Sequence, residues 1–409
     1  MRLQSPGEPG PLIISGPDEI SICGNDKWFY VLLVMKLIVG ISAEGSIVLM
    51  EGQMRHFKSK GFDTYLLAPY SDRVRQYCEK EGCTHLFINI RRDISVLHDI
   101  VILIKIFRIF LRVKPDIINL GTPKISLLGM IAGKLLGVPK RIYTCRGFRF
   151  EHEHGIKRKI LILMERITAY CAHKIICISP SLRDYGIAHN LFNAKSAIVI
   201  NKGSSNGFNL KRFSSEMIDK NQQTALIREL GIEDKFVFGF VSRIYDRKGI
   251  NELYQVFSKL SNQFPDMVLL MVGRYEEGQT ADKSILEQLR KHGRIFLVGS
   301  QKNVPLYLSL MHVFVLPAWG EGFGNVMVEA AAMGLPVIGT NSTGIRDSFQ
   351  NGFNGLQIEA KNPQELEDAM ILLYTNRELR MSLGKNGPVW AGNFDNMIIW
   401  NGMEQVYLN

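Results

Sequence analysis

Two glutamates around a glycine turn are the residues of this chain best suited to chemistry. Glu321 and Glu329 stand eight positions apart, and Gly-Phe-Gly, residues 322–324, directly follows the first of them. A helix that starts on such a turn offers free backbone N–H groups and the positive end of its dipole, and glycine lets a phosphate approach closely. Glu321 would lie above this anion site. Glu329, about one turn further along, would offer oxygen acceptors to the hydroxyls of a sugar.

The residues around the turn predict the elements that position the two carboxylates. Residues 312–316 predict a strand before the turn, and Asn325 to Met333 predicts a helix after it. Gly334 suits the C-cap of that helix and Pro336 cannot continue it, so residues 337–340 predict the next buried strand. An ordinary strand-to-helix turn with a solvated second glutamate is the alternative.

Two cations are predicted to reach the same edge of the sheet as the glutamates. Residues 236–241 predict a strand whose exit loop carries Arg243 and Lys248. The next two predicted strands end at the same edge, which adds Gly273 and Val298 to the candidate residues. Ligands of parallel α/β sheets bind at the carboxyl ends of the strands, so these groups are expected to share one ligand.

The composition predicts a globular protein of two domains with a preference for anionic partners. A chain of 409 residues with 46% hydrophobic and 22% charged residues exceeds one hydrophobic core. The formal net charge of +10 favours nucleotide phosphates, an acidic membrane surface or nucleic acid. The six cysteines show no C-x-x-C pair and no zinc spacing, so we expect free thiols, a reducing compartment and, by default, the cytoplasm.

Strand and helix patterns alternate from residue 36 onward, which predicts an α/β fold with parallel, doubly wound sheets. We expect a Rossmann-like N-terminal domain at residues 35–203. The polar, glycine-rich stretch at residues 201–213 predicts the crossing to a second Rossmann-like domain at residues 204–390. Residues 391–409 predict a C-terminal helix that packs back on the N-terminal domain.

The first 34 residues differ from the rest of the chain. Residues 1–27 are rich in Gly, Pro and Ser without periodicity, so we expect residues 1–34 to form an extension outside the core. The apolar run from Trp28 to Ile41 has about 14 residues and contains Lys36, and it is too short for the roughly 20 residues of a membrane span. It also lacks the features of a signal sequence, so we predict neither.

Two segments combine basic and apolar residues, as helices on anionic bilayers do. Residues 100–114 place Lys105, Arg108 and Arg112 on one face of a mostly apolar helix, for which packing on the sheet is the stronger interpretation. Residues 157–164 begin with three basic residues and continue as an apolar run, and here membrane contact and packing stay equally open. We expect a cytoplasmic protein that can attach to the inner face of the cytoplasmic membrane.

From about residue 35 to its end the chain resembles the family-4 retaining glycosyltransferases of GT-B fold. Residues 321–329, EGFGNVMVE, match the E-x7-E element of that family, and residues 242–249, SRIYDRKG, match its arginine and lysine loop. Residues 121–124 and 146–151 look like the subgroup that builds bacterial capsule, O-antigen and exopolysaccharide. The resemblance implies hexosyl or N-acetylhexosaminyl transfer with retention, from a nucleoside diphosphate sugar, expected to be UDP-linked, to a saccharide or polyprenyl-diphosphate-linked acceptor.

The resemblance also implies a role for each candidate residue. Arg243 and Lys248 would hold the diphosphate, Glu321 would bind hydroxyls of the transferred sugar, and Glu329 would bind the ribose. Backbone groups of residues 323–326 would contact phosphate and sugar. The candidates form a catalytic, a donor-binding and an acceptor-side set: Glu321, Arg243, Lys248 and Arg146; Gly273, Val298, Phe323, Gly324, Asn325, Val326 and Glu329; Gly45, Ser46 and Lys124.

The N-terminal half departs from the family pattern at three places. Arg146 stands where many relatives carry a histidine near the reaction centre, and Gly121 stands where the T-P-K loop often begins with histidine. Asn209 replaces the aspartate of the usual N-G-x-D after the crossing. None of these changes removes a donor contact, but the catalytic role of Arg146 stays open.

The chain offers cations, and no D-x-D metal motif, to a departing diphosphate. Its charge must be stabilised by a divalent metal or by cationic side chains and a helix N-terminus. The chain has no D-x-D and does have Arg243 and Lys248, so we expect no metal and no cofactor. A helix dipole contributes roughly 0.3–1 kcal/mol, whereas loss of a desolvated charge partner costs about 2–5 kcal/mol, so the cations should matter more than the helix.

Other functions fit the sequence less well. A nucleotide-sugar epimerase can share the GT-B architecture and stays the main alternative, which product analysis would distinguish. A nicotinamide oxidoreductase would need G-x-G-x-x-G after the strand at residues 36–42, where none occurs. No nucleic-acid recognition motif accompanies the positive charge, so we expect no nucleic-acid partner. A scaffold without activity would have no need of the two glutamates and the two cations.

Overall fold

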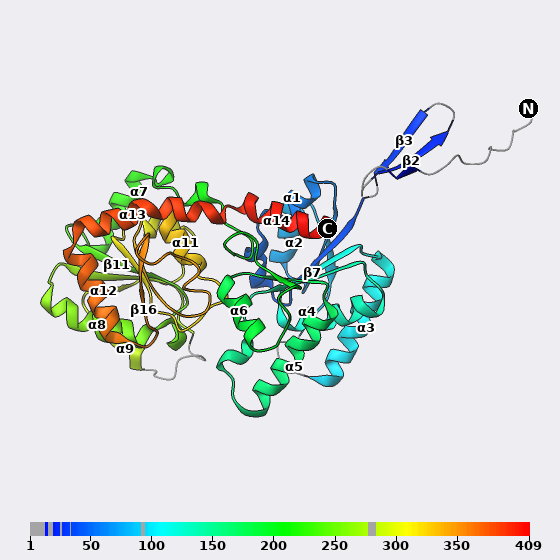
Figure 1. Ribbon diagram of the computed structural model, residues 1–409. Helices are drawn as coiled ribbons and strands as arrows, with labels where there is room; N and C mark the ends of the chain where they lie inside the picture. Colours follow the sequence, from blue (N-terminus) through cyan, green and yellow to red (C-terminus); the bar gives the residue numbers. More distant parts are fainter. Residues whose placement is uncertain (1–12, 15–18, 25–26, 33, 91–94, 277–283) are drawn as a thin grey trace, which may run out of the picture.

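The protein folds as two α/β domains that lie side by side (Figure 1). The computed structural model describes residues 13–14, 19–24, 27–32, 34–90, 95–276 and 284–409. In these residues, seven parallel strands form the sheet of the N-terminal domain and six parallel strands form that of the C-terminal domain. This confirms the predicted fold class of two Rossmann-like domains.

The N-terminal sheet has the strand order β10-β9-β8-β7-β4-β5-β6. Its strands are short apolar runs, because a parallel sheet covered on both faces excludes water from them. Helices alternate with the strands, and turn chemistry sets their ends: α2 follows Ser71, whose Oγ accepts the Val74 N–H at 3.2 Å, and stops at Gly82. The strands are β4 Lys36–Gly40, β5 Asp63–Ala68, β6 Thr84–Phe87, β7 Ile117–Leu120, β8 Lys140–Cys145, β9 Lys174–Cys177 and β10 Ala197–Ile198. The helices are η1 Glu44–Met50, α1 Gln53–Ser59, α2 Asp72–Glu81, α3 Val96–Val113, α4 Pro123–Leu135, η2 Arg149–His152, α5 Gly155–Cys171 and α6 Pro180–Ala188.

The C-terminal sheet has the order β13-β12-β11-β14-β15-β16. Three of its strands, at residues 236–241, 267–272 and 337–340, have the predicted bounds, and α11 stops where expected, with Gly334 left-handed at φ 79°. The strands are β11 Phe236–Val241, β12 Met267–Val272, β13 Ile295–Leu297, β14 Val313–Leu316, β15 Val337–Thr340 and β16 Gly355–Ile358. The helices are η3 Leu210–Phe213, η4 Ser215–Met217, α7 Lys220–Leu230, η5 Asp246–Lys248, α8 Ile250–Gln263, α9 Ser284–Lys291, α10 Val304–Leu308, α11 Asn325–Ala332, α12 Pro363–Thr375 and α13 Arg377–Ala391.

The last helix, α14 (Asn396–Leu408), returns to the N-terminal domain after η7 (Gly392–Phe394) (Figure 1). Tyr407 is fully buried there, and its hydroxyl accepts a hydrogen bond from Asn119 Nδ2 of β7 at 2.6 Å. Lys140 Nζ donates to the carbonyl oxygens of Tyr407 and Leu408 at 2.6 and 2.5 Å, which supplies donors to the end of the helix. The chain therefore joins the two domains twice.

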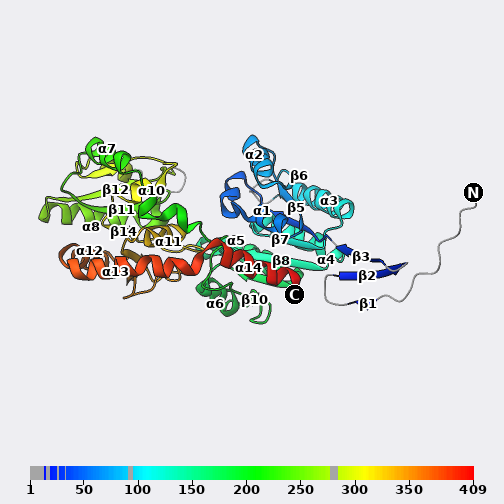
Figure 2. The same ribbon diagram turned by 90° about the horizontal axis from the view of Figure 1, so that it is seen from above.

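A small antiparallel sheet precedes the first domain. It has the order β1-β2-β3, with β1 Ile13–Ile14, β2 Glu19–Gly24 and β3 Lys27–Leu32, and its strands pair only with one another among the described residues. It extends away from both parallel sheets (Figure 2). β3 falls on the apolar run that begins near Trp28, but the Gly- and Pro-rich surroundings of β2 gave no strand signal. The rest of the predicted extension lies outside the described residues.

Helix α3 packs one face on its domain and exposes the other. Ile102, Ile106 and Phe110 are its only buried residues. Its outer face exposes large apolar side chains, namely Val96, Leu97, Ile100, Val101, Ile104 and Leu111. The predicted packing on the sheet is confirmed for the face that carries Ile102, Ile106 and Phe110, and the opposite face lies at the surface of the domain. Within the described ranges, no helix has the length and apolar character needed to cross a membrane.

Candidate active site

Lys248 and Glu321 meet between the exit loops of two neighbouring strands. Lys248 ends η5 after β11, its side chain is buried, and its Nζ forms an ion pair with Glu321 Oε1. Gly249, at φ 72°, follows at once, and a side chain there would collide with the Pro317 carbonyl at the end of β14. This close approach of the two loops brings the predicted cation and carboxylate together.

The charges around Lys248 oppose one another. Burial, and then the guanidinium groups of Arg243 and Arg247, lower the pKa of Lys248 to about 7. The contact with the Glu321 carboxylate acts in the other direction and favours the charged amine. Arg243 is exposed, and its guanidinium lies 5.1 Å from the ring centroid of Tyr245. A fixed, buried cation therefore lies beside one that can reach a ligand.

The two domains touch next to this ion pair. Any side chain at Gly322 would collide with the carbonyl oxygen of Arg146 in the N-terminal domain. Ser181, at the start of α6, also reaches across: its Oγ accepts the Gly344 N–H at 2.8 Å and donates to Asp347, and its N–H donates to Asp347 Oδ2 at 3.0 Å. Glycine at residue 322 thus permits the close approach of the domains.

The turn before α11 has fewer free amides than the sequence predicted. The helix begins at Asn325, so residues 321–324 are not helical. The Gly324 N–H donates to the Gly344 carbonyl at 3.3 Å, and the Asn325 N–H donates to the Phe323 carbonyl at 3.0 Å. Two of the four predicted backbone donors are therefore already used, because the turn is tied to the loop after β15.

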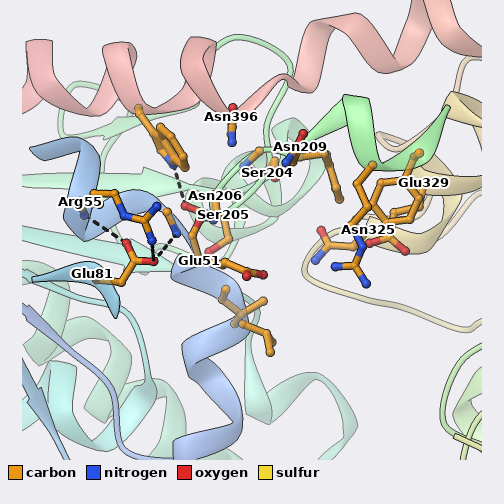
Figure 3. A pocket seen from close by; sticks show the side chains of 18 of the residues that line it. Glu51, Arg55, Glu81, Ser204, Ser205, Asn206, Asn209, Asn325, Glu329 and Asn396 are labelled. Atoms are coloured by element: carbon orange, nitrogen blue, oxygen red, sulfur yellow. Dashed lines mark hydrogen bonds and ion pairs between the residues drawn. The ribbon is translucent and has the colours of Figure 1, made fainter. Parts of the chain in front are cut away.

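Glu329 lines a cavity of about 510 Å³ between the domains. Figure 3 shows Glu329 and Asn325 of α11 on one side of it, and Glu51, Ser205 and Asn206 on the other. Most of these side chains are amides, hydroxyls and carboxylates, which are the groups that pair with sugar hydroxyls. The cavity therefore suits a polyhydroxylated ligand.

The side chains of the two walls are held in different ways. Asn206 Oδ1 accepts hydrogen bonds from Gln53 Nε2 at 3.1 Å and from Trp400 Nε1 at 2.7 Å, so its orientation is fixed by α1 and α14. Burial raises the pKa of Glu329 to about 7, and the charge of Arg212 opposes that shift. A ligand hydroxyl that donates a hydrogen bond to Glu329 would therefore meet a carboxyl near the midpoint of its titration at neutral pH.

A neighbouring hollow of about 370 Å³ is lined by Arg243, one of the two predicted cations. Glu321 and Arg243 line it from the C-terminal domain, and Arg146 and Gly121 line it from the N-terminal domain. Leu49 lines both this hollow and the cavity of Glu329, so the two spaces are adjacent. One extended ligand can reach both glutamates.

Known proteins share both halves of this arrangement. The family model described as glycosyl transferases group 1 matches residues 222–390, and the model described as glycosyl transferase 4-like matches residues 38–179. The capsular polysaccharide biosynthesis glycosyltransferase CapM of Staphylococcus aureus is 35% identical over 384 residues, which are 94% of this chain and 97% of the relative. The chain belongs to the group 1, family-4-like glycosyltransferases.

Two further comparisons agree with this assignment. The UDP-Gal:alpha-D-GlcNAc-diphosphoundecaprenol alpha-1,3-galactosyltransferase of Escherichia coli is 28% identical and covers 80% of this chain and 83% of its own. The crystal structure of Anabaena HepE in complex with UDP superimposes with a TM-score of 0.75 at 18% identity, over 91% of this chain and 99% of that one, which shows the GT-B fold. The matching family models are those of glycosyltransferases, so they favour transfer over the epimerase alternative.

Three charged residues of this glycosyltransferase's hollow were missed by sequence reasoning: Arg149, Glu151 and Arg247. Arg247 and Glu151 line it from opposite domains, and burial raises the pKa of Glu151 to about 7 while the charge of Arg247 opposes the shift. Arg247 directly precedes Lys248 in the matched loop, and Glu151 ends the segment at residues 146–151. Their proximity was invisible because it depends on how the domains face each other, which no spacing within one loop records.

Nine of the predicted residues of the glycosyltransferase line neither space: Gly45, Ser46, Lys124, Lys248, Gly273, Val298, Phe323, Gly324 and Val326. Lys124 is buried in α4 and forms an ion pair with Asp99 Oδ1 of α3 at 2.7 Å, so its amine is engaged by another helix of its own domain. Gly273 and Val298 lie at the ends of β12 and β13, and the Gly273 N–H donates to the Gly299 carbonyl at 2.8 Å. The loop positions of these two glycosyltransferase residues agree with the prediction, but their contact with the cavity does not.

The remaining predicted residues lie near the cleft. Gly45 and Ser46 lie in η1, and Val48 and Leu49 of the same 3-10 helix line the cavity of Glu329. Val326 is the second residue of α11 and packs partly against the C-terminal core. The described part of this glycosyltransferase contains no cluster of three or more His, Cys, Asp or Glu placed to hold a metal ion.

Proposed function

We propose that the protein transfers a sugar from a UDP-linked donor, with retention, to a saccharide or polyprenyl-diphosphate-linked acceptor in bacterial surface polysaccharide synthesis. The observation that carries this is the buried Lys248 amine in contact with Glu321, beside the exposed guanidinium of Arg243. A cation pair next to a carboxylate suits a ligand with a diphosphate next to hydroxyl groups.

The donor extends across the two adjacent spaces. Arg243 and Lys248 hold the diphosphate, Glu321 accepts hydrogen bonds from the transferred sugar, and Glu329 accepts them from the ribose. The shared boundary at Leu49 supports this placement, since one ligand then contacts both carboxylates. When the diphosphate binds, its oxygens and the Glu321 carboxylate both favour the charged form of Lys248.

The chemistry depends on the charge that develops on the leaving diphosphate. Preorganised cations in a water-poor site stabilise such charge without a cost of reorganisation during the reaction. Lys248 is already held in position by its ion pair, and Arg243 can move onto the ligand from the rim. We therefore propose that the leaving group departs without a metal ion and that no other cofactor takes part.

The names of relatives support the proposed substrates. The Escherichia coli relative is named for a UDP-sugar donor, a diphosphoundecaprenol-linked acceptor and an alpha linkage. The Staphylococcus aureus relative is named for capsular polysaccharide biosynthesis. Both are consistent with a nucleoside diphosphate sugar in the cleft and with an acceptor that is carried on a lipid.

The outer face of the N-terminal domain suits attachment to an anionic membrane. Besides the apolar residues exposed on α3, helix α5 begins with basic residues at 157–159 and exposes one apolar stripe: Ile156, Ile160, Leu163, Ile167 and Tyr170. Such a surface binds acidic lipids through charge and apolar burial together, and salt weakens it. Sedimentation should show binding to anionic vesicles that salt releases, and equal behaviour with neutral vesicles would contradict it.

Thermal denaturation with a panel of nucleotides tests the proposed donor. A ligand at 100 times its dissociation constant stabilises the folded protein by about 2.7 kcal/mol. We expect UDP and one UDP-sugar to raise Tm, with transfer of label from that sugar to a lipid-linked saccharide and retention of the anomeric configuration by NMR. No stabilisation by any nucleoside diphosphate would contradict the proposal.

A further inference from the structure

Arg146 and Arg247 reach one hollow from opposite domains, and each keeps a donor without an acceptor. Arg146 follows β8, and its Nε donates to Ser205 Oγ at 2.7 Å. Its Nη1 and the Nε of Arg247 are both buried, and neither has a hydrogen-bond partner among the residues the structure describes. A buried donor left unpaired costs free energy, so such atoms in a cleft indicate the place of a ligand oxygen.

Gly121 provides the space that Arg146 occupies. A side chain at residue 121 would overlap the Nη1 and Cζ atoms of Arg146. Gly121 follows β7 and is not among the glycines with positive φ, so the missing side chain, and not backbone freedom, is what the structure uses there. The two departures from the family pattern, at residues 121 and 146, are thus one feature: glycine at one position admits arginine at the other.

The hollow has more positive charge than a donor diphosphate would neutralise. Two carboxylates, Glu151 and Glu321, line it together with four arginines: Arg146, Arg149, Arg243 and Arg247. Glu321 is paired with Lys248, and the proposed donor diphosphate is bound by Arg243 and Lys248. This leaves three arginines facing Glu151, a surplus that a second anion would balance.

We propose that Arg146, seated on Gly121, and Arg247 form a second anion subsite that binds the phosphate of the acceptor. This rests on the proposed function. In an acceptor whose sugar is linked to phosphate, the phosphate lies one ring away from the attacked hydroxyl, so its subsite must adjoin Glu321, as this one does. Guanidinium groups from the two domains would grip the phosphate oxygens through short, charge-assisted hydrogen bonds.

Calorimetry with inorganic pyrophosphate on the full-length protein saturated with UDP tests the subsite. We expect one pyrophosphate to bind while UDP occupies the donor site. Arg146→Gln and Arg247→Gln should each weaken pyrophosphate binding by about 10- to 100-fold and leave UDP affinity unchanged, since each removes one charged donor pair. Arg75→Gln, on the exposed face of α2, is the control and should behave like wild type.

Gly121→Ala tests whether Arg146 needs the space beside residue 121, and it changes no charge. Because the methyl group displaces the guanidinium, it should weaken pyrophosphate binding about as much as Arg146→Gln, and it should add little to that variant in the double mutant. Unchanged UDP affinity in each variant reports an intact fold. Additive losses in the double mutant would overturn the role of Gly121.

Three results would overturn the subsite. They are failure of pyrophosphate to bind the UDP-saturated protein, indifference of its affinity to the arginine variants, and competition by phosphatidylglycerol vesicles but not by farnesyl diphosphate in detergent. The last would assign the arginines to lipid headgroups instead of to an acceptor phosphate. Failure of the wild type to bind UDP at all would contradict the proposed function and not this inference.

Discussion

The two walls of the cleft differ in how the sequence determines the positions of their charged residues. On the C-terminal side, Lys248 and Glu321 come from two loops that follow β11 and β14, and the pairing of these two strands in the parallel sheet brings the loops together. On the N-terminal side, Arg146 takes its place because Gly121, from another loop, has no side chain. The residues of the C-terminal wall belong to two recognisable motifs, whereas the position of Arg146 on the N-terminal wall depends on a glycine in a different loop.

Two buried lysines, one on each side, give the largest expected contrast. Lys248→Ala should slow transfer by about 2–5 kcal/mol in activation free energy, or roughly 30-fold to several thousand-fold, because a desolvated cation facing the diphosphate is lost. Arg243→Ala should fall in the same range. Measurement of kcat/KM for the donor checks both, and circular dichroism should show an intact fold.

Lys124→Ala is the matched change in the N-terminal domain. Its amine pairs with Asp99, so removal should lower the free energy of unfolding by about 3 kcal/mol, as for other buried ion pairs that lose one partner. Urea denaturation measures this loss. Under conditions in which the wild type and Lys124→Ala are both folded, the variant should transfer sugar at the wild-type rate. A selective loss of turnover in the variant would place Lys124 in the active site.

The two glutamates should separate in their kinetics. Glu321→Gln keeps the shape but removes the charged acceptor near the transferred sugar, so kcat should fall with folding intact. Glu329→Gln should weaken nucleotide binding and mainly raise the KM for the donor. Steady-state kinetics with varied donor distinguish the two effects, and an identical pattern for both variants would contradict the separate placement.

Glu329 should also make stability depend on pH. Its pKa of about 7 in the folded protein lies above its ordinary value of 4.5, so its contribution to stability is complete below about pH 4.5 and is lost as the pH rises to about 7. Glu329→Gln should therefore show a smaller decrease in the free energy of unfolding over this window. Urea denaturation at several pH values checks this, with the exposed Glu229→Gln as control; parallel curves for Glu329→Gln and wild type would be the contrary outcome.

The smallest effect is expected at the N-terminus. The strands β1 to β3 pair only with one another in the described residues, so a chain that starts at Met35 should stay soluble and active. Size-exclusion chromatography and a transfer assay check this. Aggregation or lost activity would show that the small sheet supports the first domain.

Sequence reasoning reached the parts of the fold and site that local chemistry determines. The strands β11 and β15 and the end of α11 at Gly334 follow from apolar runs and breakers, so their bounds were predictable. The ion pair of Lys124 was not predicted, because its partner Asp99 lies on another helix. Arg247 was missed because Glu151, which lines the same hollow, belongs to the other domain.

The direct test of the central claim is transfer in the presence of excess chelator, run in parallel on wild type, Arg243→Ala and Lys248→Ala. If these two side chains neutralise the leaving diphosphate, the wild type keeps its full rate with chelator and each variant loses at least about 30-fold without it. UDP should inhibit the wild type strongly and the Arg243 variant much less. Loss of wild-type activity on chelation, with both variants as active as wild type, would contradict the account.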